Sequence, residues 1–253
     1  MVFTSHIFIF YFLPVTLIGY YLVPRGRNVF LLAMSYIFYG WSNPWFVLLM
    51  LFATSVNYLC GGAIARAEPG SRARKLGLLA AVVVSLSTLG FFKYFMFAEN
   101  NLNHVLVSFG AEPLPVLQVL LPVGISFFIF QSLSYSIDVF RGTSPPVRSF
   151  ADFACFVALF PQLIAGPIVR YNTVADQLIH RDHSFPKFSM GAALFILGFA
   201  KKLLLANPVG GIADAVFAAE APAVLDAWFG VVAYAFQIYF DFSAYSDMAI
   251  GLG

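Results

Sequence analysis

Apolar stretches long enough to cross a lipid bilayer recur along this chain of 253 residues. A membrane-spanning helix needs about 20 mainly apolar residues, and the stretch from Trp45 to Ala65 contains no charged residue. Hydrophobic residues make up 60% of the sequence and charged residues 10%, whereas soluble domains carry about 25% charge. Inside lipid the backbone has to satisfy its own hydrogen bonds, which favours helices. We therefore predict an all-α, polytopic transmembrane helical protein with a single membrane domain over residues 1–253.

Other apolar stretches have the same character. They lie at residues 3–23, 29–41, 76–98, 119–140, 153–168, 190–206 and 223–253. The stretch at 153–168 contains two prolines and a glycine, which release backbone groups that lipid cannot satisfy, so we expect it to be broken or re-entrant. Asn207 and Pro208 are expected to break the helix that begins near Met190. The sequence thus predicts about seven crossings plus one re-entrant segment.

Charged loops give a partial orientation. Residues 66–75 contain four basic side chains and residues 99–112 contain two acids without any Lys or Arg. The positive-inside rule places the first loop in the cytoplasm and the second outside.

Ser149 and Asp152 have the spacing of a helix-capping box at the start of a later helix. The net charge of +2 is too weak to imply a nucleic-acid partner, no basic tract occurs, and we expect no such partner.

The polar residues of the segment 239–251 are the main candidates for a functional site. Asp241 and Tyr245 are four residues apart, as are Ser243 and Asp247, so each pair shares a face of a helix. Carboxylates inside a membrane are costly and face a protein interior or a water-filled cavity. They either line such a cavity or form hydrogen bonds that hold neighbouring helices, and both interpretations stay open. The helical spacing also places Met248 on the face of Asp241 and Tyr245.

Two glutamines lie in segments that contain helix-breaking residues. Gln131 follows Pro122 and Gly124, and Gln162 follows Pro161. Gln131 either faces a cavity or makes a hydrogen bond between packed helices. Irregular backbone at membrane depth occurs where it lies against protein or water, which favours a place for Gln162 near a functional centre.

The remaining reactive side chains follow no known catalytic or metal-binding pattern. Consecutive Lys201 and Lys202 are typical of an anchor at the membrane surface, with a cavity as the alternative. Cys60 and Cys155 lie in apolar stretches and are expected to be buried thiols without a disulfide or a metal. No histidine lies in an apolar stretch beside a candidate nucleophile. The four histidines are His6, His104, His180 and His183.

Four segments, in this order, closely resemble the membrane-bound O-acyltransferase family, and most of all its bacterial alginate O-acetyltransferase branch. They are LPVGISFFIFQSLSYSIDVFRG at 121–142, FPQLIAGPIVRY at 160–171, GFAKKLLLAN at 198–207 and YFDFSAYSDMAIG at 239–251. The resemblance implies helices that surround a tunnel through the bilayer. Because of their polarity at membrane depth, six residues are the candidates for the wall of this tunnel. They are Gln131, Gln162, Asp241, Ser243, Tyr245 and Asp247.

The resemblance also implies an activity. An acetyl group from a cytoplasmic donor such as acetyl-CoA would pass to a hydroxyl group or a partner protein on the far side of the bacterial inner membrane. In the alginate branch this serves O-acetylation of an exported polysaccharide, with periplasmic partners completing the transfer. The alternatives are D-alanyl transfer to teichoic acid, a small-solute transporter, and a membrane scaffold without enzymatic activity.

One motif of the family is missing. The family's catalytic histidine lies in a Trp/Arg-rich motif that follows the segment matched at 239–251, and none of the four histidines of this chain matches it. The resemblance therefore implies an N-terminal fragment of a longer protein. Without a general base for O-acyl transfer, the chain as given is expected to be inactive.

Overall fold

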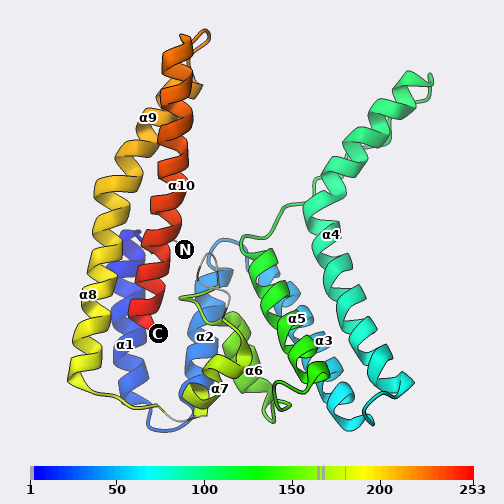
Figure 1. The fold of residues 1–253 in the computed structure, drawn as a ribbon, viewed down its shortest axis with the longest axis vertical. Helices are drawn as coiled ribbons and strands as arrows, with labels where there is room; N and C mark the ends of the chain where they lie inside the picture. The colour runs from blue at the N-terminus through cyan, green and yellow to red at the C-terminus, as the bar shows by residue number, and fades with distance from the viewer. Residues whose placement is uncertain (1–2, 164–165, 167–168, 180) are drawn as a thin grey trace. The chain divides into compact units, whose positions relative to one another are not determined.

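The computed structural model describes residues 3–163, 166, 169–179 and 181–253. Helices make up 76% of the structure, and no strand occurs among the described residues (Figure 1), which confirms the predicted all-α class. The helices are η1 (Phe8–Phe12), α1 (Leu13–Leu22), α2 (Arg27–Gly40), α3 (Trp45–Arg66), α4 (Arg72–Ser108), α5 (Ile125–Arg141), α6 (Phe150–Ala158), α7 (Tyr171–Ile179), α8 (Phe185–Lys201), η2 (Lys202–Ala206), α9 (Asn207–Phe217) and α10 (Val224–Leu252).

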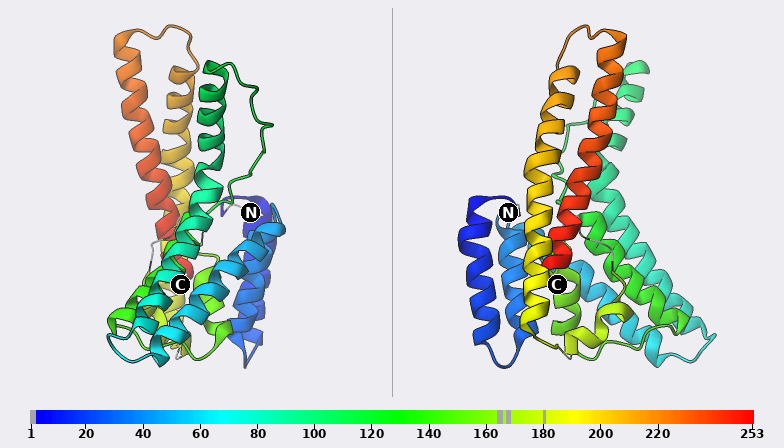
Figure 2. Two further views of the ribbon diagram at one scale, coloured as in Figure 1. Left: turned by 90° about the vertical axis from the view of Figure 1, so that its right-hand side faces the viewer. Right: turned by 60° about the vertical axis from the view of Figure 1, so that its left-hand side comes forward.

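The chain divides into two compact units. The first contains Met1–Leu22, Phe160–Pro167 and His180–Gly253, and so includes η1, α1 and the helices from α8 to α10. The second contains Val23–Leu159 and Ile168–Ile179, and so includes α2 to α7. Within the first unit, α9 and α10 run side by side as a hairpin in every view (Figure 2). The single membrane domain expected from the sequence stays a prediction.

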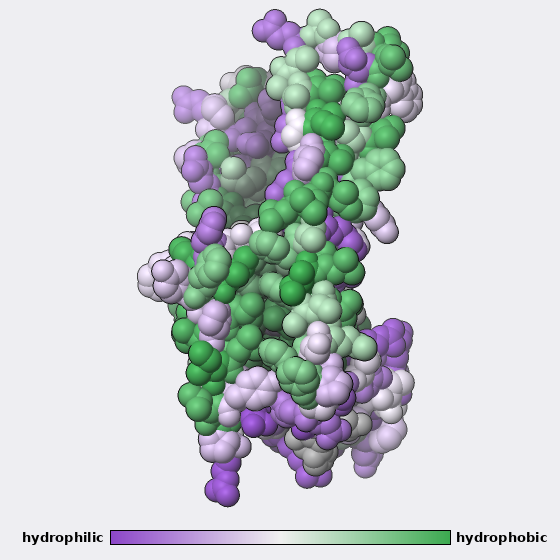
Figure 3. Space-filling view, turned by 90° about the vertical axis from the view of Figure 1, so that its left-hand side faces the viewer, coloured by the Kyte–Doolittle hydropathy of each residue, from purple (hydrophilic) through white to green (hydrophobic). Residues whose placement is uncertain are grey.

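In the part of the chain that the structure describes, three helical runs are long and apolar enough to cross a membrane. They are α3, α4 and the run Phe185–Phe217 that joins α8, η2 and α9. Phe8–Leu22 forms a shorter apolar helix. Apolar residues cover much of the surface in Figure 3, as expected for contact with lipid. These features are consistent with a membrane protein, whereas the count of about seven crossings stays a prediction.

The break expected at Asn207 and Pro208 does not occur. Proline has no N–H to donate to the carbonyl group four residues earlier, which usually kinks or ends a helix. Here the chain forms the π-helical segment η2 just before the proline, and the Asn207 N–H donates to the Lys202 carbonyl oxygen five residues earlier. This wider turn changes the pattern of backbone hydrogen bonds just before Pro208. The helix is therefore not interrupted, and α8, η2 and α9 continue as one helical run.

Two other helix ends differ from those expected. α4 continues to Ser108, so much of the predicted outer loop at 99–112 is helical. This segment has no proline or glycine before Gly110, whose positive φ of 75° ends the helix. α5 begins at Ile125 and not near residue 119, because Pro122 lacks an N–H and Gly124 takes a left-handed conformation with φ of 76°.

The segment around Pro161 is described only in part. α6 begins where the sequence predicts, and the Asp152 N–H donates to the Ser149 Oγ atom over 3.3 Å. The helix ends at Ala158, before Pro161. The expected re-entrant element includes Ile164, Ala165, Pro167 and Ile168, which lie outside the described residues. It therefore stays a prediction.

Candidate functional site

Helices α8 and α10 approach each other closely enough for their backbones to meet. A Cβ atom added to Gly198 would lie 2.6 Å from the Ala244 carbonyl oxygen, and one added to Gly191 would lie 2.5 Å from the Gly251 carbonyl oxygen. Both distances are too short for a side chain unless the backbone shifts. Small residues allow this kind of close packing between helices. The close approach brings the lysines at the end of α8 within reach of the acids of α10.

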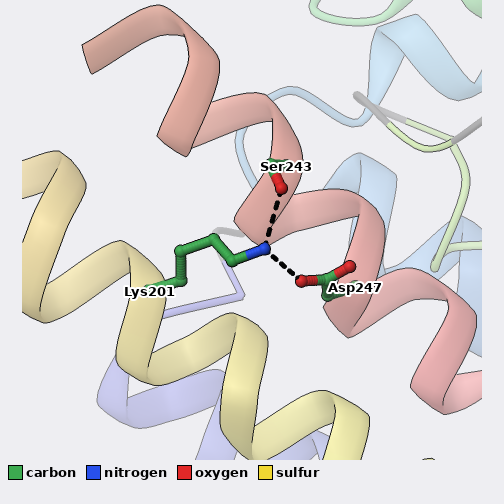
Figure 4. A network of polar contacts seen from close by, with 3 residues as sticks. All are labelled: Lys201, Ser243 and Asp247. Atoms are coloured by element: carbon green, nitrogen blue, oxygen red, sulfur yellow. Dashed lines mark hydrogen bonds and ion pairs between the residues drawn. The ribbon is translucent and has the colours of Figure 1, made fainter. Parts of the chain in front are cut away.

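Lys201 joins the two polar residues of α10 that share one helical face. Its Nζ atom donates to the Ser243 Oγ atom at 2.8 Å and to the Asp247 Oδ2 atom at 2.5 Å (Figure 4). The side chains of Lys201 and Asp247 are 23% and 25% exposed, so this ion pair is partly buried. The four-residue spacing of Ser243 and Asp247 therefore lets both of them bind one ammonium group.

Lys202 forms the second ion pair with α10. Its ammonium group donates to the Asp241 Oδ1 atom. Consecutive residues of a regular α-helix point about 100° apart, and the π-helical segment that begins at Lys202 changes the helical geometry at this position. The two lysines thus bind two acids six positions apart on the antiparallel helix.

Sequence reasoning missed both ion-pair partners of these lysines. Two lysines in one apolar stretch and two aspartates in another were a signal for such pairing.

A pocket of about 380 Å³ lies beside the second ion pair. Asp241, Tyr245 and Met248 line it together, as their spacing on one helical face predicts. The Tyr245 ring also stacks on Phe3, with ring centres 4.6 Å apart and planes inclined by 8°. The other lining residues are Thr4, Lys202, Ile238 and Phe242. Most of the wall is apolar, and the charges are confined to one ion pair.

The two glutamines lie in different units. Gln131 belongs to the second unit, is 2% exposed, and donates from its amide nitrogen to the Phe156 carbonyl oxygen over 2.9 Å. This bond is of the kind expected between packed helices. Gln162 belongs to the first unit and is also buried. The structure thus gathers Asp241, Ser243, Tyr245 and Asp247 on α10, and the tunnel wall stays a prediction for all six residues.

A second polar cluster, which sequence reasoning missed, joins α3, α4 and α5. The Asn57 amide nitrogen donates to Ser85 Oγ at 3.0 Å and to Ser132 Oγ at 3.3 Å. The Ser136 hydroxyl donates to the Asn57 Oδ1 atom over 2.9 Å. All four side chains are buried. Small polar residues in three apolar stretches were the available signal for this hydrogen-bonded cluster.

Three of the four histidines lie among the described residues. The His183 Nε2 atom is 2.8 Å from the Tyr20 hydroxyl oxygen, and both residues are exposed to some degree. His6 and His104 are exposed, and His180 lies outside the described residues. Among the described residues no group of three metal-binding side chains occurs. The expectation that this chain holds no catalytic histidine and no metal stays a prediction.

Known proteins match the chain over its whole length. Proteins described as "Probable alginate O-acetylase AlgI" from Azotobacter vinelandii and Pseudomonas aeruginosa are 49% and 48% identical to it, and the match covers 51% and 49% of their lengths. The Helicobacter pylori protein described as "Peptidoglycan O-acetyltransferase" is 31% identical, with 54% of its length covered. The chain thus spans about half the length of the curated relatives that it matches.

No protein-family model matches the chain. The similarity to the relatives nevertheless extends over every segment on which the resemblance was based, including 198–207 and 239–251. Over the whole of its sequence the chain is therefore a homologue of the alginate O-acetylases, which confirms its resemblance to the membrane-bound O-acyltransferase family.

Proposed function

We propose that this chain is about half of a bacterial inner-membrane O-acetyltransferase that modifies an exported polysaccharide of the alginate type. The observation that carries the proposal is the match to alginate O-acetylases at 45–49% identity over the whole chain. The apolar helices support a place in the membrane. In this reaction the acceptor hydroxyl forms an ester with the acetyl carbon, and a thioester donor such as acetyl-CoA releases its thiol.

The paired helices α8 and α10 give this half of the protein a defined polar face. Lys201 and Lys202 form ion pairs with Asp247 and Asp241 of α10, and Lys202 and Asp241 also line the pocket. We assign to these residues the shaping of the tunnel wall, and no step of the chemistry. The general base belongs, in this proposal, to the part of the relatives that the chain does not cover, and periplasmic partners complete the transfer.

A second acceptor has a specific observation in its favour. The Helicobacter pylori relative is named for O-acetylation of peptidoglycan and is 31% identical to the chain. The alginate-type relatives have a higher identity, so we favour an exported polysaccharide. The names of the relatives support transfer of an acetyl group more than transfer of D-alanine, transport or a scaffold role.

The test compares two forms of the protein in membrane vesicles. The 253-residue chain and a form extended along the gene to the length of its relatives are each supplied with radiolabelled acetyl-CoA, periplasmic extract, and either alginate or peptidoglycan. We expect label in alginate with the extended form and none with the 253-residue chain. Label in peptidoglycan alone would show that peptidoglycan, and not alginate, is the acceptor. Acetyl transfer by the 253-residue chain at the rate of the extended form would contradict the proposal that the general base lies outside this chain.

A further inference from the structure

Two polar layers lie at opposite ends of α8 within the unit that contains α1 and α10. At the first layer, the Arg181 guanidinium carbon lies 5.8 Å from the centre of the Tyr20 ring, and His183 contacts the hydroxyl of the same tyrosine. Tyrosine and basic residues are enriched where a bilayer meets water. This layer has the composition of a membrane surface.

The second layer contains the ion pair between Lys202 and Asp241. The 17 residues of α8 separate the two layers, which corresponds to a rise of about 26 Å at about 1.5 Å per residue. The hydrocarbon core of a bilayer is about 30 Å thick. This separation is close to the thickness of one hydrocarbon core, which supports a place for the ion pair near the lipid headgroups.

The pocket beside this ion pair has an apolar wall and one charged edge. Phe3, Ile238, Phe242 and Met248 supply the wall. Its volume of about 380 Å³ falls in the range of ligand sites, and Phe242 is 50% exposed, so part of the wall is accessible from outside. An alkyl chain suits such a surface because it removes apolar area from water.

The charged edge still has hydrogen-bonding capacity. A lysine ammonium group has three N–H donors, and among the described residues Asp241 is the one hydrogen-bond partner of the Lys202 ammonium group. Asp241 accepts through its Oδ1 atom, and its side chain is 37% exposed. A ligand thus finds a positive donor and a negative acceptor side by side. A group with a net negative charge is attracted by the lysine and repelled by the aspartate.

We propose that this pocket binds a zwitterionic phospholipid whose headgroup carries a phosphate and a primary ammonium group, of the phosphatidylethanolamine type. The phosphate oxygens accept from Lys202, the ammonium group donates to Asp241, and one acyl chain lies along Phe242 and Ile238. A phosphatidylglycerol headgroup has no positive charge for Asp241. A phosphatidylcholine headgroup has a positive charge without any N–H to donate.

The test measures lipid binding to the purified, delipidated 253-residue protein by native mass spectrometry. Phosphatidylethanolamine, phosphatidylglycerol and phosphatidylcholine with the same acyl chains are titrated separately. We expect phosphatidylethanolamine to bind about tenfold more tightly than the other two, as the loss of one charge-assisted hydrogen bond implies. Equal affinity for the three lipids would overturn the proposal, and so would a preference for phosphatidylglycerol.

Three variants and one control locate the site. Lys202→Gln and Asp241→Asn should each abolish the preference, whereas Lys75→Gln, which changes an exposed lysine far along the sequence, should keep it. The double exchange of Lys202→Asp with Asp241→Lys retains both charges and the ion pair, and should retain the preference even if the single variants fold poorly. Unchanged selectivity in both single variants would place the lipid elsewhere and overturn the proposal, as would lost selectivity in a folded double exchange.

Discussion

The two polar clusters of this protein join helices in different ways. Around Asn57, every side chain that takes part is neutral, and Asn57, Ser132 and Ser136 are each 0% exposed. Around Lys201, the partners are charged, and the side chains of Lys201 and Asp247 remain about one quarter exposed. The first cluster links three helices of one unit, and the second links α8 and α10 of the other.

The difference follows from the cost of burying each kind of group. A neutral amide or hydroxyl group loses little when it exchanges water for a protein hydrogen bond. A charge loses far more unless it keeps a partner and some contact with water. The neutral cluster can therefore be fully enclosed, whereas the ion pairs stay at a partly open edge. Four substitutions test this contrast, with the unfolding free energy in detergent as the common measurement.

The largest effect is expected from Asn57→Asp. The new side chain has nearly the same shape, but its carboxylate would be enclosed without a cation. We expect a loss of about 3–5 kcal/mol, the cost of an uncompensated buried charge. Asn101→Asp, at an exposed position of α4, is the matched control and should cost less than about 0.5 kcal/mol. Similar losses in the two variants would show that the Asn57 cluster is not enclosed.

The second substitution, Asp247→Asn, removes the partner of Lys201. We expect a loss of about 2 kcal/mol, below the range for fully buried pairs because water still reaches this one. Replacing Lys201 and Asp247 together by leucine should restore most of the stability, since no lone charge then remains. A double variant as unstable as the sum of the single variants would indicate two residues that act independently.

Gly198→Ala tests the close approach of the helices that brings the charges together. The added methyl group meets the Ala244 carbonyl oxygen, which belongs to the backbone and cannot rotate away. We expect a loss of about 1–2 kcal/mol from overpacking. Gly211→Ala is the control, because a Cβ atom at Gly211 has no neighbour within 4 Å; it should be neutral or stabilise α9 by up to about 1 kcal/mol. A tolerated Gly198→Ala would mean that the two helices can separate without loss.

The smallest effect is expected from Ser243→Ala. This change removes one of the two acceptors of the Lys201 ammonium group and leaves the Asp247 ion pair intact. We expect a loss of about 1 kcal/mol, typical of one hydrogen bond at a site that water can reach. A loss as large as that of Asp247→Asn would show that the hydroxyl, and not the carboxylate, is the main partner of the lysine.

Local rules predicted much of the fold and of the α10 face. The apolar stretches gave the long helices, the Ser149 cap gave the start of α6, and helical spacing gave the shared faces of Asp241 with Tyr245 and of Ser243 with Asp247. These features depend on residues within a few positions of one another, so the sequence contains the information directly.

The rest depends on packing between distant segments. Asp247 meets Lys201 across 46 positions only because Gly198 lets α8 and α10 approach, and no local pattern reveals that crossing. The error at Pro208 has the same kind of cause. A missing N–H ends a helix when the preceding turn stays regular, but here that turn widens and the helix continues.

The π-helical turn at Lys202–Ala206 also determines which insertions and deletions this helix can accept during evolution. A π-helical turn is equivalent to one extra residue inserted into an α-helix. Each inserted residue rotates everything beyond it by about 100° about the helix axis. The side of α9 that meets α10 is therefore tied to this single position. A deletion of one residue here would rotate α9 about its axis and leave α8 in place. The same deletion in a loop would change only the conformation of the loop.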